Sequence, residues 1–173
     1  RGVGAFPSGD FPADLIKELF LKGDFLHNGG DIHITAGRDV LGADSHQFIS
    51  EWMSRVGGID NSLSSEVDLP VAWAIDVARF QQNIGALGGG DVTLTAGGDI
   101  DNLSIVIPTT GQPVDGSGTA PSVDGGGDLR IETGGDVRGG VFYLGKGRAD
   151  IAAGGSVTSA AGGSVYPILA LGD

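Results

Sequence analysis

The stretch LGGGDVTLTAGGDIDN, residues 87–102, places two Gly-Gly-Asp triplets on either side of a short run in which apolar and polar residues alternate. Val92 and Leu94 alternate with threonines, as expected for a β-strand, whose successive side chains point to opposite faces. Glycine permits a positive φ or a tight bend, and a following aspartate can bond the backbone amides of a corner. The stretch therefore predicts a short strand between two sharp corners.

The same pattern recurs along the chain. Copies begin as GGDIHITAGRDV at Gly29, GGDVTLTAGGDI at Gly89, GGDLRIETGGDV at Gly126 and KGRADIAAGGSV at Lys146, and a half-copy begins at Gly162. One such unit buries too little apolar surface to offset its ordering entropy, so the units are expected to stack. The repeat predicts an all-β fold, a right-handed parallel β-helix with a small helical insertion, of five or six coils.

The spacing of the copies predicts where the coils are interrupted. The 20 residues between Gly127 and Gly147 suit one coil of a parallel β-helix. The spacings of 37 residues from Gly90 to Gly127 and of 60 residues from Gly30 to Gly90 are longer. We therefore expect insertions within the first two coils.

Composition excludes several classes of protein. Glycine accounts for 33 of 173 residues, well above the roughly 7% of ordinary proteins, while a hydrophobic content of 40% argues against disorder. The formal charge of −12 disfavours nucleic acid and anionic lipid as partners. Cysteine is absent, which excludes disulfides and thiolate metal sites. No apolar run is long enough to predict a membrane span, and the start at Arg1 rather than Met suggests part of a longer polypeptide.

The segments between the copies predict other elements. A helix is expected over residues 45–56, where an apolar stripe follows a capping-box spacing and precedes Gly57; the stripe comprises Phe48, Ile49, Trp52, Met53 and Val56. A second helix is expected over residues 13–21, and residues 71–77 alternate like a strand. Residues 108–127 are rich in Pro, Gly, Ser and Thr and predict an exposed loop.

These expectations divide the chain into three parts. Residues 1–43 would begin the β-helix and carry a short helix. Residues 44–84 would form a helix-containing insertion that returns to the shaft, by which we mean the stack of coils. Residues 85–173 would form further coils, with the exposed loop at 108–127.

Three stretches carry a resemblance to a known family: RFQQNIGALGGGDVTLTAGGDIDNLSIVIPTTGQ, GGGDLRIETGGDVRGGVFYLGKGRADIAAGGSV and YPILALGD. Over residues 80–173, with a weaker echo at 29–42, the chain resembles the filamentous-haemagglutinin-like large exoproteins of Gram-negative bacteria, which are two-partner-secretion adhesins. The resemblance implies a right-handed parallel β-helix shaft, export across the outer membrane by a dedicated secretion partner, and roles in adhesion, biofilm or contact-dependent delivery. It carries over no catalytic residue, and residues 13–84 depart from the plain repeat.

The repeated aspartates form two rows of candidate site residues. One row contains Asp31, Asp91 and Asp128, and the other contains Asp39, Asp99 and Asp136. Carboxylate oxygens suit calcium, so Asp91, Asp99, Asp128 and Asp136 are weak calcium candidates. The calcium-binding nonapeptide order is missing, however, and a 20-residue shift sets Asp128 over Arg148 and Asp136 over Ser156. Capping of the corners is the favoured interpretation, with no cofactor.

Aromatic and histidine residues give weaker signals. Trp52 and Trp73 are candidate ligand contacts because indole rings stack on sugars, but Trp52 in a helical stripe more often seals an insertion against a shaft. His27, His33 and His46 share no metal-ligand spacing and are expected at the surface.

The sequence favours a non-enzymatic function. The first expectation is a structural shaft segment of a secreted fibrous bacterial exoprotein, extracellular or at the cell surface, that serves adhesion or scaffolding. Its partners would be the rest of a longer chain or further copies stacked end to end, the secretion partner, and surface glycans or proteins. One alternative is a glycan- or protein-binding module formed by the insertions. A second is a polysaccharide-degrading enzyme, for which Arg79, Arg138 and Arg148 with nearby acids supply residue types.

Overall fold

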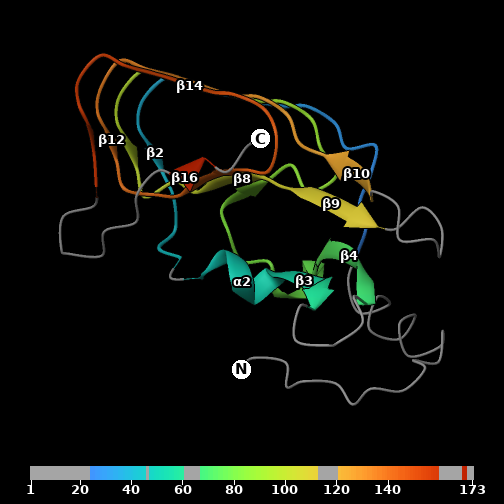
Figure 1. Ribbon diagram of the computed structural model, residues 1–173. Helices are drawn as coiled ribbons and strands as arrows, with labels where there is room; N and C mark the ends of the chain where they lie inside the picture. Colours follow the sequence, from blue (N-terminus) through green and yellow to red (C-terminus); the bar gives the residue numbers. More distant parts are fainter. Residues whose placement is uncertain (1–23, 46, 61–66, 113–120, 160–168, 171–173) are drawn as a thin grey trace.

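The computed structural model of the protein describes residues 24–45, 47–60, 67–112, 121–159 and 169–170 (Figure 1). The elements in chain order are β1 (Ile32–Ala36), β2 (Val40–Leu41), α2 (Ile49–Trp52), β3 (Met53–Asp60), β4 (Val67–Ile75), the 3-10 turn η1 (Val77–Arg79), β5 (Ile84–Gly85), β6 (Val92–Ala96), β7 (Ile100–Asp101), β8 (Ile105–Ile107), β9 (Thr109–Gln112), β10 (Ser122–Gly125), β11 (Leu129–Thr133), β12 (Val137–Arg138), β13 (Phe142–Leu144), β14 (Ala149–Ala153), β15 (Val157–Thr158) and β16 (Leu169–Ala170). The helix expected over 13–21 lies outside the described residues.

Three parallel sheets build the shaft. Their strand orders are β1-β6-β11-β14, β2-β7-β12-β15 and β5-β8-β13-β16. Each turn of the chain adds one strand to each sheet, so coil 1 consists of β1, β2 and β5, coil 2 of β6 to β8, coil 3 of β11 to β13 and coil 4 of β14 to β16. The predicted parallel β-helix is confirmed, and the described residues form four coils rather than five or six.

The register shows how the coils tolerate insertions. Ile32 pairs with Val92, Val92 with Leu129, and Leu129 with Ala149. Equivalent corner residues are separated by 60, 37 and 20 residues at the three successive junctions. Against a 20-residue coil, the first excess is 40 residues and the second is 17. Both insertions leave the strand pairing in register.

The interior of the shaft is a column of stacked apolar side chains. Val92, Leu94 and Ile131 are completely buried because a coil covers them on each side. Among the described coils, the first and the last have one neighbour each, and their equivalent residues Ile32 and Ile151 are only partly buried. The buried column comprises Ala86, Val92, Leu94, Ala96, Ile100, Leu103, Ile105, Ile107, Leu129, Ile131, Val137, Phe142 and Leu144.

Two physical reasons favour glycine at the corners between strands. Gly90, before a strand, has a φ of 119°, which disfavours any side chain. Gly97, after the strand, has no such φ, but a Cβ there would overlap the carbonyl oxygen of Gly37 in the coil below. A Cβ on Gly90 would likewise overlap the carbonyl oxygen of Gly30, so close axial approach of neighbouring coils favours glycine at both corners, and the expected backbone freedom is an additional reason at the first corner only.

The helix predicted over residues 45–56 is wrong in extent. Only Ile49–Trp52 is α-helical, and the chain enters β3 at Met53, where it pairs antiparallel with β4. Backbone pairing with β4 overrides the helical periodicity, as tertiary context commonly does. The strand predicted over 71–77 is confirmed for residues 71–75, which belong to β4, but β4 ends at Ile75 and Val77 begins η1.

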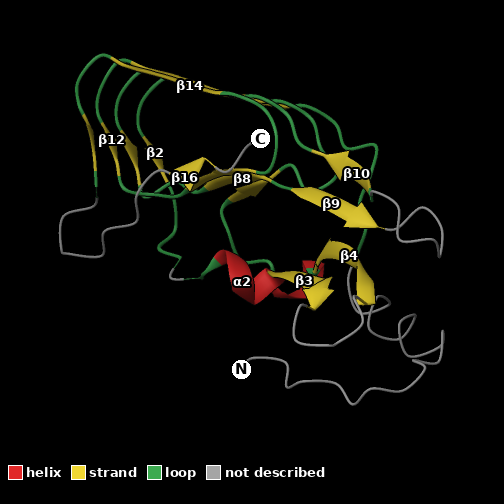
Figure 2. Cartoon of the chain, in the orientation of Figure 1, coloured by secondary structure: helices red, strands yellow, loops and turns green. Residues whose placement is uncertain are grey.

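The exposed loop predicted over residues 108–127 is corrected at its start, while Ser122 and Val123 are exposed as expected and residues 113–120 lie outside the described residues. Thr109 and Thr110, at the start of β9, are buried, and β9 pairs antiparallel with β10. Strand β9 also contacts β4, where Trp73 is opposite Gly111. Strands β10, β9, β4 and β3 thus form one antiparallel sheet, which we call the lateral sheet and which lies beside the shaft (Figure 2). The segment shows no apolar periodicity because its buried residues, Thr109, Thr110 and Gly111, are threonines and a glycine.

Candidate functional site: the aspartate ladders and the lateral sheet

The first row of aspartates links all four coils. The Oδ1 atom of Asp31 accepts a hydrogen bond of 2.9 Å from the amide of Asp91, and Asp91 Oδ1 accepts one of 2.8 Å from the amide of Asp128. Asp128 Oδ1 accepts from the amide of Arg148 at 2.8 Å. Each carboxylate therefore bonds an amide of the next coil, whereas the sequence suggested an amide of its own corner.

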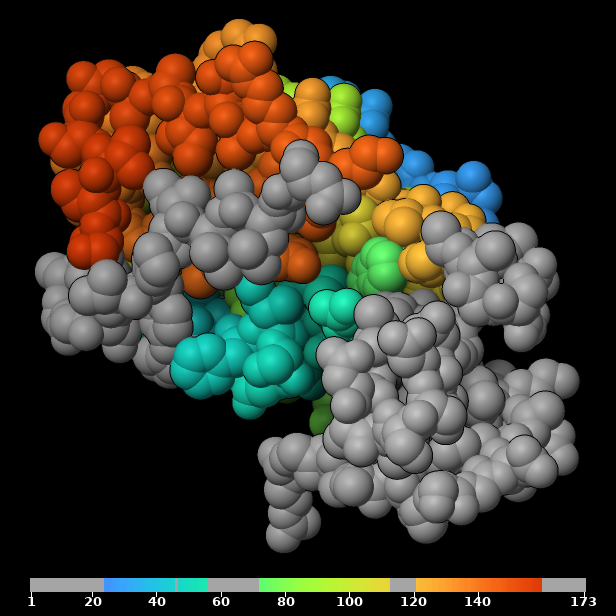
Figure 3. Space-filling model, in the orientation of Figure 1, coloured from blue at the N-terminus to red at the C-terminus, as the bar shows by residue number. Residues whose placement is uncertain are grey.

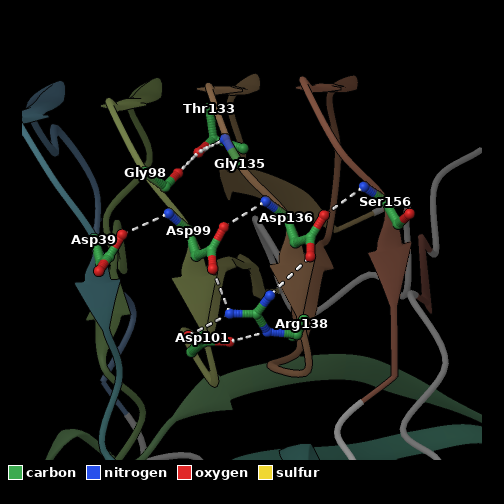
Figure 4. A network of polar contacts seen from close by, with 9 residues as sticks. All are labelled: Asp39, Gly98, Asp99, Asp101, Thr133, Gly135, Asp136, Arg138 and Ser156. Carbon is green, nitrogen blue, oxygen red and sulfur yellow. Dashed lines mark hydrogen bonds and ion pairs between the residues drawn. The ribbon is translucent and has the colours of Figure 1, made fainter.

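The second row repeats this geometry at the next corner (Figure 4). Asp39 accepts from the amide of Asp99, Asp99 from that of Asp136, and Asp136 from that of Ser156, each at 2.8 Å. Charged acceptors make stronger hydrogen bonds to backbone amides than neutral ones. The two rows, which we call the aspartate ladders, tie the coils together at corners where the strands have ended.

Arg138 neutralises part of the second ladder. Its Nη2 lies 2.5 Å from Asp99 Oδ2, its Nε 2.7 Å from Asp101 Oδ1 and its Nη1 2.8 Å from Asp136 Oδ2. The hydrogen bond from the Asp136 amide, followed by that from Arg138, lowers the pKa of Asp99. Asp101 and then Asp99 raise the pKa of Arg138. One guanidinium thus supplies, between coils 2 and 3, the positive charge that a bound cation would supply.

The four calcium candidates do not converge on a common site. Asp91, Asp99, Asp128 and Asp136 each commit Oδ1 to the amide of the following coil. Among the residues that the structure describes, no group of three or more His, Asp or Glu side chains is placed to hold a metal ion. The described geometry of these carboxylates serves contacts between coils.

The arginines considered for an enzyme lie in different settings. Arg79 pairs with Asp76 at 3.2 Å in the insertion, and Arg148 pairs with Asp150 at 3.4 Å on the outer face of coil 4. Arg138 belongs to the ladder described above. The structure therefore does not bring these three arginines together around one group of acids.

Trp52, one of the two aromatic candidates for a ligand contact, is buried in the seal that the sequence offered as its other interpretation. Its side chain is 1% exposed and packs edge-on against Phe80 and Tyr143, with centroid distances of 5.2 and 6.4 Å. Ile75 and Val106 complete this second core, which joins the insertion to the outer face of the sheet containing β8 and β13. Figure 3 shows α2 and the start of β3, in teal, against the shaft. Because residues of both the insertion and the shaft pack against Trp52, its side chain closes the contact between them.

Trp73 joins the two insertions. Its Nε1 donates to Thr109 Oγ1 at 3.2 Å, and the six-membered ring lies where a Cβ on Gly111 would be. The ring is half-buried rather than presented on an open surface. The structure thus assigns Trp73 first to the contact between β4 and β9, a contact that the spacing of the residues in sequence does not reveal.

Side-chain amides close the base of the first insertion. Gln47 Oε1 accepts from the amide of Gln81 at 2.9 Å, and Asn83 Nδ2 donates to the carbonyl of Ala43 at 3.0 Å. Asn83 Oδ1 also accepts from the amide of Ser104 in coil 2 at 2.7 Å. The sequence places Gln47 with Asp44 at a capping-box spacing, whereas α2 is capped by Glu51, whose carboxylate accepts from the Phe48 amide. Asn83 was missed because an isolated amide produces no periodic signal.

The described histidines lie at the surface. His27 contacts the carbonyl of Phe25 at 3.1 Å, and His33 is exposed on the outer face of β1. His46 lies outside the described residues. In the part of the chain that is described, His27 and His33 therefore belong to no metal cluster.

Comparison with family models, curated proteins and solved structures found no match to this chain. In the described part of the chain, no helix combines the length and apolar character that a membrane crossing requires.

Proposed function

We propose that the chain is a structural shaft segment of a secreted fibrous bacterial exoprotein that serves adhesion or scaffolding at the cell surface. The observation that carries this proposal is the pair of aspartate ladders, which run along the shaft and cross every junction between the described coils. Carboxylates placed in this way stabilise stacking. The resemblance to filamentous-haemagglutinin-like exoproteins supports export through an outer-membrane partner.

The architecture suits a structure that must be long. Each 20-residue coil advances the chain by about 4.8 Å along the axis, because neighbouring strands are that far apart. The formal charge of −12 opposes non-specific association between shafts. A shaft of this kind would hold a binding region away from the cell that secretes it.

Electron microscopy and fibre diffraction of the intact parent protein test the proposal. We expect thin fibres with an axial repeat of about 4.8 Å that runs along the fibre. Compact particles without that repeat would contradict a shaft function.

The lateral sheet favours a second candidate function, a glycan- or protein-binding module. Two insertions that leave different coils build one sheet, with Trp73 at their contact. A shaft alone does not require such a sheet. A glycan array probed with the labelled chain, and with a Trp73→Ala variant as comparison, tests this function: retention by specific glycans that the variant loses would support it. Equal signals from both proteins, or none, would count against a glycan site at Trp73.

A further inference from the structure

Met53 carries the only sulfur atom of the chain, which has one methionine and no cysteine. It begins β3 directly after Trp52, and it packs against the second core, through which the insertion contacts the shaft. The side chain is half-buried. Met53 therefore takes part in the contact between the two regions and can still be reached by a small molecule from the solvent.

The hydroxyl of Tyr143 donates to this sulfur. Tyr143 lies on β13 of the shaft, is 8% exposed, and has its oxygen 3.6 Å from Met53 Sδ. Among the described residues, Met53 is the hydrogen-bond partner of this hydroxyl, and a thioether is only a weak acceptor. Burial also raises the pKa of Tyr143, as expected for a hydroxyl held away from water. A buried donor thus meets a poor acceptor at this contact.

A second donor of the same core has no acceptor. Trp52 Nε1 is buried and, within the described part of the chain, has no hydrogen-bond partner. Its ring packs edge-on against Tyr143, with a centroid distance of 6.4 Å. Buried donors without acceptors are rare in folded proteins, because each has lost its hydrogen bonds to water. The second core therefore contains more donors than good acceptors, and an added oxygen atom would find a donor there.

From these observations we propose that Met53 is a site of reversible oxidation by peroxides, and that the oxygen of its sulfoxide accepts the hydrogen bond from the Tyr143 hydroxyl. In the reaction an S–O bond forms as the O–O bond of the peroxide breaks. The thioether is oxidised by two electrons, and hydrogen peroxide is reduced to water. A sulfoxide commonly disrupts an apolar core. Here the contact between the insertion and the shaft survives oxidation, because Tyr143 pairs with the new polar group.

Peroxide treatment of the full chain, with and without Tyr143→Phe, tests this assignment. Phenylalanine keeps the ring and removes the donor. Peptide mass spectrometry should place one added oxygen on Met53 in both proteins and none on Trp52. Amide hydrogen exchange then compares reduced and oxidised forms. In the wild-type protein β3 and β4 should keep their protection, whereas in oxidised Tyr143→Phe their exchange should accelerate by about twofold to tenfold, because the sulfoxide lacks its donor.

Matched controls isolate the sulfur atom and its position. Met53→Leu keeps an apolar side chain of similar size but cannot form a sulfoxide, so peroxide should leave its exchange unchanged with either residue at position 143. Strands β6 and β11 should be unaffected in every form, because the shaft core does not contain Met53. Methionine sulfoxide reductases for both epimers should return oxidised Tyr143→Phe to the exchange of its reduced form.

Two results would overturn the assignment. An equal effect of oxidation on the exchange of wild type and of Tyr143→Phe, whether an acceleration or none, would mean that Tyr143 does not pair with the sulfoxide. Met53 that stays unmodified while free methionine in the same solution is oxidised would mean that peroxide does not reach it. Neither result bears on the shaft function, which the axial repeat of the fibres tests separately.

Discussion

Coils 2 and 3 of the shaft and the lateral sheet are held together by different means. In the coils, each residue repeats the role of its equivalent one coil away, so Leu94 and Ile131 share one buried row and Asp99 and Asp136 share one ladder. In the lateral sheet, no position repeats another. Trp52 and Trp73 each make a contact that occurs once, the first with the shaft and the second between the two hairpins.

The difference shows how insertions are tolerated by a stacked fold. Pairing between coils depends on the positions that meet at each junction, and the lengths of chain that separate them do not change it. Extra loop length adds little entropic cost to such pairing. The insertions are therefore free to form a separate sheet, whose stability rests on a few large side chains.

Removal of Trp52 should have the largest effect, and it should destabilise the lateral sheet while leaving the shaft intact. Trp52→Ala deletes the largest side chain of the second core, a change that typically costs about 3–5 kcal/mol. We expect amide hydrogen exchange to accelerate in β3 and β4 while β6 and β11 stay protected, because the shaft core does not contain Trp52. Trp52→Phe should preserve most of the protection, and equal acceleration in both regions would show that they unfold as one unit.

The stability lost when an interior side chain of the shaft is truncated should depend on whether its coil is central or at an end. Leu94→Ala removes a fully buried side chain from coil 2 and should lower the free energy of unfolding by about 2–5 kcal/mol. Ile34, its neighbour in coil 1, is only partly buried, so Ile34→Ala should cost clearly less. Urea denaturation measures both values, and equal losses would contradict the distinction between central and end coils.

The contact between the two hairpins should be sensitive to a single methyl group. A Cβ on Gly111 would overlap the Trp73 ring, so Gly111→Ala should lower stability by about 1–3 kcal/mol through overpacking. Thermal unfolding of this variant can be compared with that of Gly30→Ala, a corner position with no atom within 4 Å of the added carbon. If the two variants unfold alike, Trp73 does not pack closely on Gly111.

The smallest effect should be the pH dependence contributed by Asp99. Its pKa in the folded protein is lowered below the ordinary value of 3.8 by the Asp136 amide and Arg138. The ionised form therefore stabilises the fold above that value, and the contribution is lost as pH falls through the folded pKa. Asp99→Asn keeps an oxygen that can accept from the Asp136 amide but cannot ionise.

Acid titration followed by circular dichroism checks this sign. Between about pH 4 and pH 2 the wild-type protein should lose stability more steeply than Asp99→Asn. High salt should reduce the difference because the ion pair is partly exposed. Parallel curves for the two proteins would mean that the ladder contributes no ionisation-linked stability.

The repeat in the sequence was sufficient to predict the parallel coils, the burial of Val92 and Leu94, and the alignment of Asp128 with Arg148. All of these follow from short-range alternation and from a spacing that the chain itself repeats. The corner aspartates were recognised for the same reason. The direction of their hydrogen bonds was not, because an amide of the same corner and an amide of the next coil look alike in one dimension.

Only the tertiary structure decided the rest. It cut the helix expected over residues 45–56 to four residues, since pairing of β3 with β4 satisfies the backbone better than further helix turns. In the structure Thr109 and Thr110 are buried, and the two insertions form one sheet with Trp73 at their contact. Local pattern sets the structure wherever a unit repeats and packs on its own copy. Where a segment packs on a partner that occurs once, distant in sequence, the outcome depends on shape, which the order of residues does not display.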